Sequence, residues 1–133
     1  MKSVNIELIL ESLKKVKVAV LGDFCIDAYW ILNPDGGEIS VETGQKTSAV
    51  RKHYYTLGGA SNIVANLAVL TPEKIYAIGC IGEDIFGREL LRQLKQLNVN
   101  CDGIIIQPDN YDTVAFGKPV LEENELPRID FGF

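Results

Sequence analysis

With 133 residues, of which 47% are hydrophobic, the chain can bury a core and has the length of about one domain. Its formal net charge is -5 and no cluster of lysine and arginine offsets it, so we expect no nucleic-acid partner and no contact with an anionic membrane. No apolar run approaches the roughly 20 residues that span a bilayer, and residues 1–15 lack the pattern of a signal peptide, so we expect a cytoplasmic protein.

The three cysteines, Cys25, Cys80 and Cys101, are widely separated and form no Cys-x-x-Cys pair, and the one histidine is His53. An odd number of scattered thiols with a single histidine predicts neither a disulfide framework nor a zinc site. We therefore expect three reduced, buried thiols and no metal site.

The first elements predicted along the chain are a short amphipathic helix over residues 5–15 and a strand over residues 16–21. The valine-rich run 16–21 is nearly continuous in apolar residues, which is typical of a strand buried on both faces of a parallel sheet. Ligands of such sheets collect beyond the carboxyl ends of the strands, so polar chemistry is expected over residues 23–27. Asp23 follows a glycine and is typical of a turn. Asp27 stands in an apolar stretch, where a carboxylate needs partners, and is the stronger candidate for ligand binding.

Residues 33–44 are rich in proline, glycine and small polar side chains and are predicted to form a loop or a hairpin. The next segment, residues 45–57, combines the strand-forming Val50, Tyr54 and Tyr55 with charged side chains. Because such a strand is half polar, we expect it outside the main sheet. It is either a lid over the site or an edge that pairs with a second chain.

Gly58 and Gly59 stand directly before an apolar run with helical spacing, and this combination predicts a helix start. The free N–H groups of such a start can meet an anion or a polyol, and Asn62 offers both a donor and an acceptor to a hydroxyl. The alternative is a tight turn in which Ser61 or Asn62 satisfies the helix end. An alanine at position 59 distinguishes the two: it costs stability where φ is positive, and ligand affinity where the backbone borders a ligand.

The face of this helix expected to be buried holds Ile63, Leu67 and Leu70, with Val64 and Ala68 beside them.

After this helix, the patterns predict a strand over 74–78 followed by Gly79 and Gly82, a helix over 83–97 and a strand over 103–106. Strands over 113–120 and 127–133 follow, joined by an acidic turn at 122–125. This alternation predicts a parallel sheet with helices on its faces. The glycine spacing misses G-x-G-x-x-G, so a dinucleotide-binding oxidoreductase is not favoured. An apolar strand is still in progress at residue 133, so we expect part of a larger protein.

Three segments together resemble the N-terminal half of the ribokinase-like (PfkB-type) carbohydrate kinases: VAVLGDFCIDAYW at 18–30, LGGASNIVANLA at 57–68 and IGCIGEDIFGRELLRQLKQLNV at 78–99. The resemblance implies an α/β fold with a Rossmann-like, mainly parallel sheet, flanking helices and a small β lid at about residues 37–57. Residues 1–133 would form the N-terminal portion of a larger domain whose nucleotide-binding half is absent. By the family's motif, sugar hydroxyls are bound at the positions of Asp27, Gly58, Gly59 and Asn62.

Within the family, the pattern D-x-Y-W at 27–30, followed by S-x-E at 40–42, looks most like the kinases of heptose phosphates. The chain departs from the family pattern at Val64, where a small residue is usual, and near Thr71, where a glycine is usual. The family's second signature, a Gly-Ala-Gly-Asp segment with the catalytic aspartate and the anion hole, has no counterpart in the 133 residues.

For a complete enzyme, the resemblance implies transfer of the γ-phosphoryl group of ATP to a hydroxyl of a sugar or sugar phosphate. ATP and Mg²⁺ are the cofactors it implies, and a homodimer through the lid strands is the expected assembly. This chain alone is expected to hold no catalytic residue, to bind neither ATP nor Mg²⁺, and to be inactive. The alternative is a non-catalytic sugar-binding or dimerisation module derived from the same fold.

Overall fold

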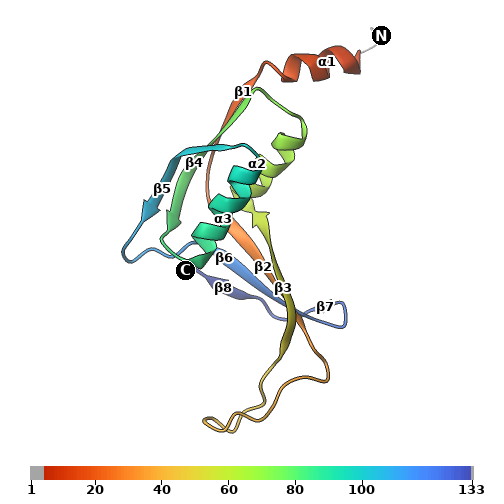
Figure 1. The fold of residues 1–133 in the computed structure, drawn as a ribbon, viewed down its shortest axis with the longest axis vertical. Coiled ribbons are helices and arrows are strands. Elements are labelled where there is room, and N and C mark those ends of the chain that lie inside the picture. The colour runs from red at the N-terminus through yellow and green to blue at the C-terminus, as the bar shows by residue number, and fades with distance from the viewer. Residues whose placement is uncertain (1–4, 133) are drawn as a thin grey trace.

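The computed structural model describes residues 5–132, which form two β-sheets and three helices (Figure 1). One sheet has the strand order β1-β4-β5; the other has the order β3-β2-β6-β7, with β8 also paired to β6. In chain order the elements are α1 (Ile6–Leu13), β1 (Lys17–Leu21), β2 (Phe24–Leu32), β3 (Val50–Gly58), α2 (Gly59–Val69), β4 (Lys74–Gly82), α3 (Ile85–Gln96), β5 (Asn100–Gln107), β6 (Ala115–Leu121), β7 (Asn124–Glu125) and β8 (Ile129–Phe131).

The three-stranded sheet is parallel throughout, as the alternation of strands and helices predicted. Helices α2 and α3 contact its strands and lie beside β4 and β5, to their right in Figure 1. Inward side chains of the strands and helices form one core, whose buried members include Val20, Ile75, Ala77, Val64 and Leu90. Because successive side chains of a strand alternate between its two faces, this packing buries one face of each strand.

The opposite face of this sheet is open to solvent among residues 5–132, so the expectation that strand 16–21 is buried on both faces is wrong. Leu21 is 77% exposed and Ile78, its partner in register, is 38% exposed, whereas Val20 is 9% exposed. A continuous apolar run predicts burial on both faces only where both faces are covered. Here outward positions such as Ala19 and Leu21 are apolar as well, and no described helix or strand packs on them.

The second sheet begins with β2, a strand that the sequence analysis did not predict. It runs antiparallel to β3 and parallel to β6. Phe24 and Ile26 belong to the core and are 2% and 0% exposed, so Asp27 and Tyr29 lie on the other face of the strand. Asp27 therefore stands within a strand, and not beyond the end of one as expected.

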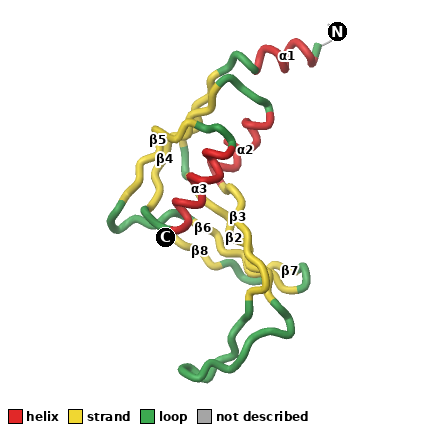
Figure 2. Tube along the Cα trace, in the orientation of Figure 1, coloured by secondary structure: helices red, strands yellow, loops and turns green. Residues whose placement is uncertain are grey.

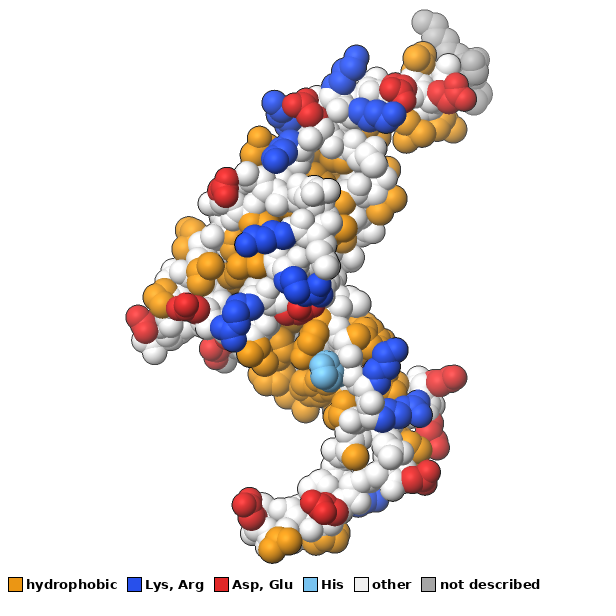
Figure 3. Space-filling model, in the orientation of Figure 1, with side chains coloured by type: hydrophobic (Ala, Val, Ile, Leu, Met, Phe, Trp, Pro, Cys, Tyr) orange, Lys and Arg blue, Asp and Glu red, His pale blue; other side chains and the backbone are white. Residues whose placement is uncertain are grey.

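Between β2 and β3, residues 33–49 form a loop that extends away from the sheets, at the bottom of Figure 2. The predicted loop is thereby confirmed, although β3 starts at Val50 and not at residue 45. Figure 3 shows acidic and hydrophobic side chains at the tip of this loop, where Ile39 is 62% and Val41 101% exposed. The loop contributes no buried apolar residue, so its conformation depends on its own backbone hydrogen bonds.

Helix α2 begins at Gly59, as the glycine pair predicted. Its buried face is the expected one only in part: Val64, Leu67 and Ala68 contact the core, whereas Ile63 and Leu70 do not belong to it. Ala60 and Val64 are buried, whereas Ile63 is 54% exposed. The helix approaches the turn after β1 closely: a Cβ added at Gly22 would lie 3.2 Å from that of Ala60. Small side chains permit this approach, so the face with alanine is selected over the face with isoleucine.

Strand β4 continues past residue 78, so Gly79 and Gly82 lie inside the strand and do not follow it. A Cβ at Gly79 would meet the ring of Phe24 at 2.6 Å, so glycine is needed for β2 to begin so close to β4. Helix α3 and strands β5, β6 and β8 overlap the segments predicted for them; Phe133 lies outside the described residues. None of the helices in the described part of the chain is long and apolar enough to cross a membrane.

Candidate functional site

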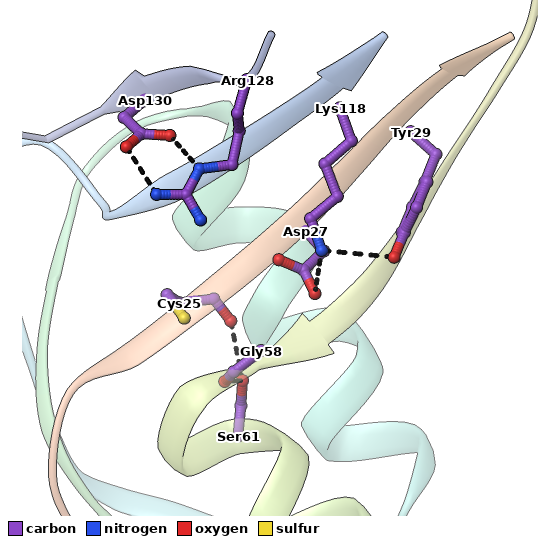
Figure 4. A network of polar contacts seen from close by, with 8 residues as sticks. All are labelled: Cys25, Asp27, Tyr29, Gly58, Ser61, Lys118, Arg128 and Asp130. Atoms are coloured by element: carbon purple, nitrogen blue, oxygen red, sulfur yellow. Dashed lines mark hydrogen bonds and ion pairs between the residues drawn. The ribbon is translucent and has the colours of Figure 1, made fainter. Parts of the chain in front are cut away.

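Asp27, the carboxylate singled out from the sequence, has a charged partner on a neighbouring strand. Its Oδ2 lies 3.1 Å from Nζ of Lys118, and the two side chains are 20% and 17% exposed. Lys118 lies on β6, in register with Tyr29 of β2, and its Nζ donates a hydrogen bond to the Tyr29 hydroxyl at 3.3 Å. Figure 4 shows the three side chains pointing toward one another. Lys118 therefore supplies the partner that a carboxylate in an apolar strand requires.

The ammonium group of Lys118 is held by aromatic rings as well as by the carboxylate. Its Nζ lies 5.0 Å from the centroid of the Tyr29 ring, and this ring is stacked on Tyr54 with centroids 4.8 Å and planes 8° apart. Burial lowers the pKa of Lys118, but hydrogen bonds to Tyr29 and Asp27 outweigh the burial, so this pKa is raised above 10.5. Lys118 is therefore positively charged at neutral pH.

Gly58 borders the same carboxylate from the other side. It ends β3 and is the N-cap residue of α2, in an extended conformation with φ of -115°. A Cβ built there would lie 3.5 Å from Cγ and Oδ1 of Asp27 and 3.0 Å from Sγ of Cys25. The bare backbone of Gly58 thus faces the oxygen that Lys118 does not hold, and no described side chain donates a hydrogen bond to that oxygen.

Gly59 is required by the backbone. Its φ is +50°, and a Cβ there would lie 2.7 Å from the carbonyl oxygen of Asp23 and 2.9 Å from Sγ of Cys25. The N–H group of Ala60 donates to the same carbonyl oxygen at 3.0 Å. No side chain caps this helix end; Ser61 Oγ instead donates to the carbonyl oxygen of Cys25 at 2.7 Å. An alanine at position 59 therefore costs stability, and it cannot serve as a test of ligand approach.

Asn62 lines a pocket of about 440 Å³ between β3, α2 and α3. The polar lining also includes Thr56 and Arg92, whereas Asp27 does not line this pocket. Thr56 is the register partner of Asp27 on β3, so the pocket begins at the strand next to the carboxylate. The structure thus brings Asp27 and Gly58 together and places Asn62 on an adjoining pocket.

Cys25, which touches both glycines of the pair, is an inert thiol. Burial, together with the nearby carboxylates of Asp27 and Asp23, raises its pKa to about 11, so the thiol is protonated at neutral pH. All three cysteines are free, as expected, but only Cys25 is buried; Cys80 and Cys101 are half-buried. The expectation of three buried thiols is therefore wrong for two of them, and Cys80 lies on the uncovered face of the three-stranded sheet.

A second polar cluster, which the sequence analysis missed, fixes the start of β6. Asp84 caps α3 by accepting a hydrogen bond from the Gly87 N–H at 2.8 Å, and its other oxygen accepts one from the Thr113 N–H at 2.6 Å. Thr113 is fully buried, and its Oγ1 accepts from the Gly82 N–H at 2.9 Å. Partial burial raises the pKa of Asp84, but the backbone hydrogen bonds from Thr113 and Gly87 outweigh it and lower this pKa overall. The cluster ties β4 and α3 to the strand that carries Lys118.

The sequence of residues 15–118 matches the family described as "pfkB family carbohydrate kinase". Among similar curated proteins, the bifunctional protein HldE of Wolinella succinogenes is 33% identical over 125 residues, covering 93% of this chain and 25% of that protein. The bifunctional protein HldE of Sulfurimonas denitrificans is 38% identical over 114 residues, covering 86% of this chain and 23% of that protein. The chain therefore spans about a quarter of the length of these relatives.

Solved structures with the same fold cover most of the chain as well. A ribokinase from Cryptococcus neoformans, crystallised with ADP, superposes with a TM-score of 0.63 at 20% identity, over 86% of this chain and 34% of that one. A nucleoside kinase of the ribokinase family from Methanocaldococcus jannaschii superposes with a TM-score of 0.59 at 19% identity, over 90% of this chain and 37% of that one. At these identities the likeness establishes the fold, which is the α/β fold expected from the sequence, shared with about a third of each longer chain.

Proposed function

Because the chain belongs to the pfkB family of carbohydrate kinases, we propose that it supplies the sugar-binding part of an ATP-dependent kinase. The proposed reaction transfers the γ-phosphoryl group of ATP to a hydroxyl of a sugar or sugar phosphate. The observation that carries the proposal is the Asp27 carboxylate, with Oδ2 held by Lys118 and Oδ1 bordering the bare backbone of Gly58. The catalytic base and the nucleotide site are proposed to belong to a part of the domain that these residues do not include.

In this proposal, Oδ1 of Asp27 accepts a hydrogen bond from a sugar hydroxyl. Gly58 has no side chain, so the sugar can approach the carboxylate closely. A hydrogen bond to a charged group contributes about 1.5–3 kcal/mol, which makes Asp27 the main polar contact. Gly59 holds the turn that presents Gly58, and Asn62 offers its amide from the adjoining pocket to a more distant part of the sugar.

The chain contributes acceptor positioning, while ATP and Mg²⁺ are proposed to bind elsewhere in the complete enzyme. Family membership implies the use of ATP. Within residues 5–132, no three histidine, cysteine, aspartate or glutamate side chains gather as a metal-ligand set. Bound with the nucleotide, Mg²⁺ would neutralise charge that develops on the transferred phosphoryl group.

We further propose that residues 37–57 act as a lid and that two chains pair through its strand, in a cytoplasmic homodimer. Strand β3 pairs with β2 along one edge, and its other edge is open in the part of the chain that the structure describes. Val50 and Tyr54 on this strand are 47% and 40% exposed. An open edge with exposed apolar side chains can accept a second strand.

The test is calorimetric titration of the full-length protein with ATP and, separately, with ribose, fructose, a heptose and a heptose phosphate. The heptose phosphate comes first because the patterns at 27–30 and 40–42 look most like those of heptose-phosphate kinases. Asp27→Asn removes the charge and is expected to weaken sugar affinity about 10- to 100-fold and to leave ATP affinity unchanged. Gly58→Ala keeps an extended backbone that alanine adopts freely, although its Cβ would lie 3.0 Å from Sγ of Cys25; it is expected to weaken sugar affinity too, and its melt shows the cost of that contact.

The matched control is Asp23→Asn, which removes an exposed carboxylate of the turn before β2 and is expected to bind sugar as the wild-type protein does. Thermal melts of each variant separate lost folding from lost binding. Unchanged sugar affinity in folded Asp27→Asn would remove Asp27 from the site. Sugar binding with no phosphoryl transfer to any of the four sugars would support the non-catalytic module.

A further inference from the structure

We propose that Lys118 is a positioning residue of the sugar site: it holds the Asp27 carboxylate and the Tyr29 hydroxyl in the orientation that meets the sugar. The inference rests on the proposed function of Asp27 and adds a residue that no motif points to. Lys118 lies on β6, which is distant in sequence from Gly58 and Gly59 and from the segment 18–30 that contains Asp27. Its role follows from which atoms its ammonium group reaches.

One ammonium group fixes two side chains of β2. Asp27 and Tyr29 are two residues apart on a strand and therefore share a face, and the parallel pairing of β2 with β6 sets Lys118 opposite Tyr29. From this position Nζ lies 3.1 Å from Oδ2 of Asp27 and 3.3 Å from the hydroxyl of Tyr29. Figure 4 shows Nζ between the two oxygens. The carboxylate and the phenol are thus held in a fixed relation to each other.

The hold is more rigid than that of a surface ion pair. Lys17 and Glu73 form a pair of the same length, 3.1 Å, but their side chains are 59% and 49% exposed, against 17% and 20% for Lys118 and Asp27. Exposed pairs of this kind contribute little because water competes and both side chains stay mobile. Lys118 is in addition confined by the ring of Tyr29, itself stacked on another ring.

This arrangement leaves two hydrogen-bonding positions for a ligand. Since Lys118 occupies Oδ2 of Asp27, Oδ1 on the side of Gly58 remains to accept a hydrogen bond. Since the phenolic oxygen of Tyr29 accepts from Lys118, its own proton remains to be donated. One acceptor and one donor on the same strand face suit a sugar, whose hydroxyls both donate and accept.

The neighbouring cation on this sheet does not replace Lys118. Arg128 on the approach to β8 forms two hydrogen bonds with Asp130, at 2.6 and 2.8 Å, and its guanidinium lies 4.2 Å from the centroid of the Phe116 ring. Figure 4 shows Arg128 turned to Asp130. The Asp27 carboxylate therefore depends on Lys118 for its orientation.

The experiment compares Lys118→Met, Lys118→Arg and the control Lys17→Met in the full-length protein, with the titrations and melts described above and with steady-state kinetics. The probe is whichever of ribose, fructose, the heptose and the heptose phosphate the wild-type protein binds most tightly. Lys118→Met is expected to raise the sugar Kd and KM by about tenfold or more, with the KM for ATP unchanged. Lys118→Arg is expected to recover part of the loss, because a guanidinium can reach both oxygens. Lys17→Met is expected to match the wild type.

Three results would overturn the inference: wild-type sugar affinity in Lys118→Met, a lowered melting temperature there with unchanged affinity of the folded protein, or no recovery in Lys118→Arg. If Lys118→Met does not fold, the deciding variant is Tyr29→Phe, because it keeps the stacked ring and removes only the hydroxyl. A severalfold weaker sugar affinity of Tyr29→Phe supports the inference, and wild-type affinity overturns it. Loss in Asp27→Asn without loss in the Lys118 variants defeats this inference alone. Unchanged affinity in Asp27→Asn defeats the proposed function itself.

Discussion

In both sheets successive side chains alternate between an inward and an outward face, but the two sheets carry different residues on the outward face. In the three-stranded sheet the inward positions pack against α2 and α3, and the outward positions, such as Leu21 and Ile78, are apolar too. In the mixed sheet the inward positions of β2 are as apolar, but the outward ones carry Asp27 and Tyr29 with Lys118 beside them. Both sheets therefore contribute to the core, and the ligand chemistry that we propose lies on the outward face of the mixed sheet, so variants should separate core packing from the proposed binding.

The largest expected effect on stability is in the core under the three-stranded sheet. Leu90 of α3 is fully buried in this core. Leu90→Ala removes three carbon atoms and leaves a cavity, so the free energy of unfolding is expected to fall by about 2–5 kcal/mol. The sugar affinity of the protein that remains folded is expected to be unchanged. Urea denaturation and calorimetry on one preparation measure both.

The control for this variant is Ile63→Ala on α2, where the side chain is 54% exposed and the loss of stability is expected to stay below about 1 kcal/mol. A folded Leu90→Ala protein that loses sugar affinity as strongly as Asp27→Asn would show that the two sheets do not act separately. Equal destabilisation by both alanine substitutions would instead contradict the packing of α2 described above.

The next effect concerns Asp84, which links the two sheets by accepting hydrogen bonds from Gly87 and Thr113. Asp84→Ala removes a helix cap and the acceptor for the Thr113 N–H, so the free energy of unfolding is expected to fall by about 1–2 kcal/mol. The matched control is Glu83→Ala, which removes the exposed neighbouring carboxylate and is expected to be nearly neutral. Equal effects of the two substitutions would show that charge at the helix start matters and that the hydrogen bonds do not.

The Asp84 effect is also expected to depend on pH. Because the folded-state pKa lies below the ordinary value of 3.8, the ionised carboxylate contributes stability that is fully present above that value and is lost as the pH falls through the folded pKa. The difference in unfolding free energy between the wild type and Asp84→Asn should therefore shrink toward low pH. Urea denaturation at neutral pH and at a series of pH values below 3.8 follows this decrease. A difference that stays constant would mean that folding does not lower the pKa of Asp84.

Local patterns in the sequence were enough to predict the three-stranded sheet and its helices. Helix α3 has a 3.6-residue apolar face, and β1 and β4 are apolar runs ended or interrupted by glycine, so each element is encoded within a short window. The start of α2 was predicted from the glycine pair. Its buried face was predicted only in part: Val64, Leu67 and Ala68 do contact the core. The choice of Ala60 over Ile63 was not predicted, because it depends on how closely the helix approaches the turn at Gly22. Periodicity finds an apolar face but does not say how close its neighbour will be.

The mixed sheet was harder to predict because its contacts join distant segments. Strand β2 reads FCIDAYWIL, with apolar residues on both faces, so it lacks the alternation that identifies a half-buried strand. Lys118 follows Tyr29 by 89 residues, and no local pattern connects them. One signal was present: Lys118 is the one charged residue of β6, as Asp27 is of β2. Two opposite charges, each alone in an apolar strand, are candidates for a pair.

The smallest expected effect on stability concerns the outer edge of β3, where association is the readout. Val50→Lys changes an exposed side chain, so the free energy of unfolding is expected to move by no more than about 0.5 kcal/mol. A lysine on an open edge nevertheless discourages a second strand from pairing with it. In sedimentation, the wild-type chain is expected to associate and Val50→Lys to shift toward the monomer.

The control is Val41→Lys, at a fully exposed position of the loop outside the strand, and it is expected to associate as the wild type does. If the wild type and Val50→Lys both sediment as monomers, the edge does not pair chains. If Val41→Lys disrupts association and Val50→Lys does not, the contact runs through the loop tip, where apolar and acidic side chains are exposed, and not through the strand.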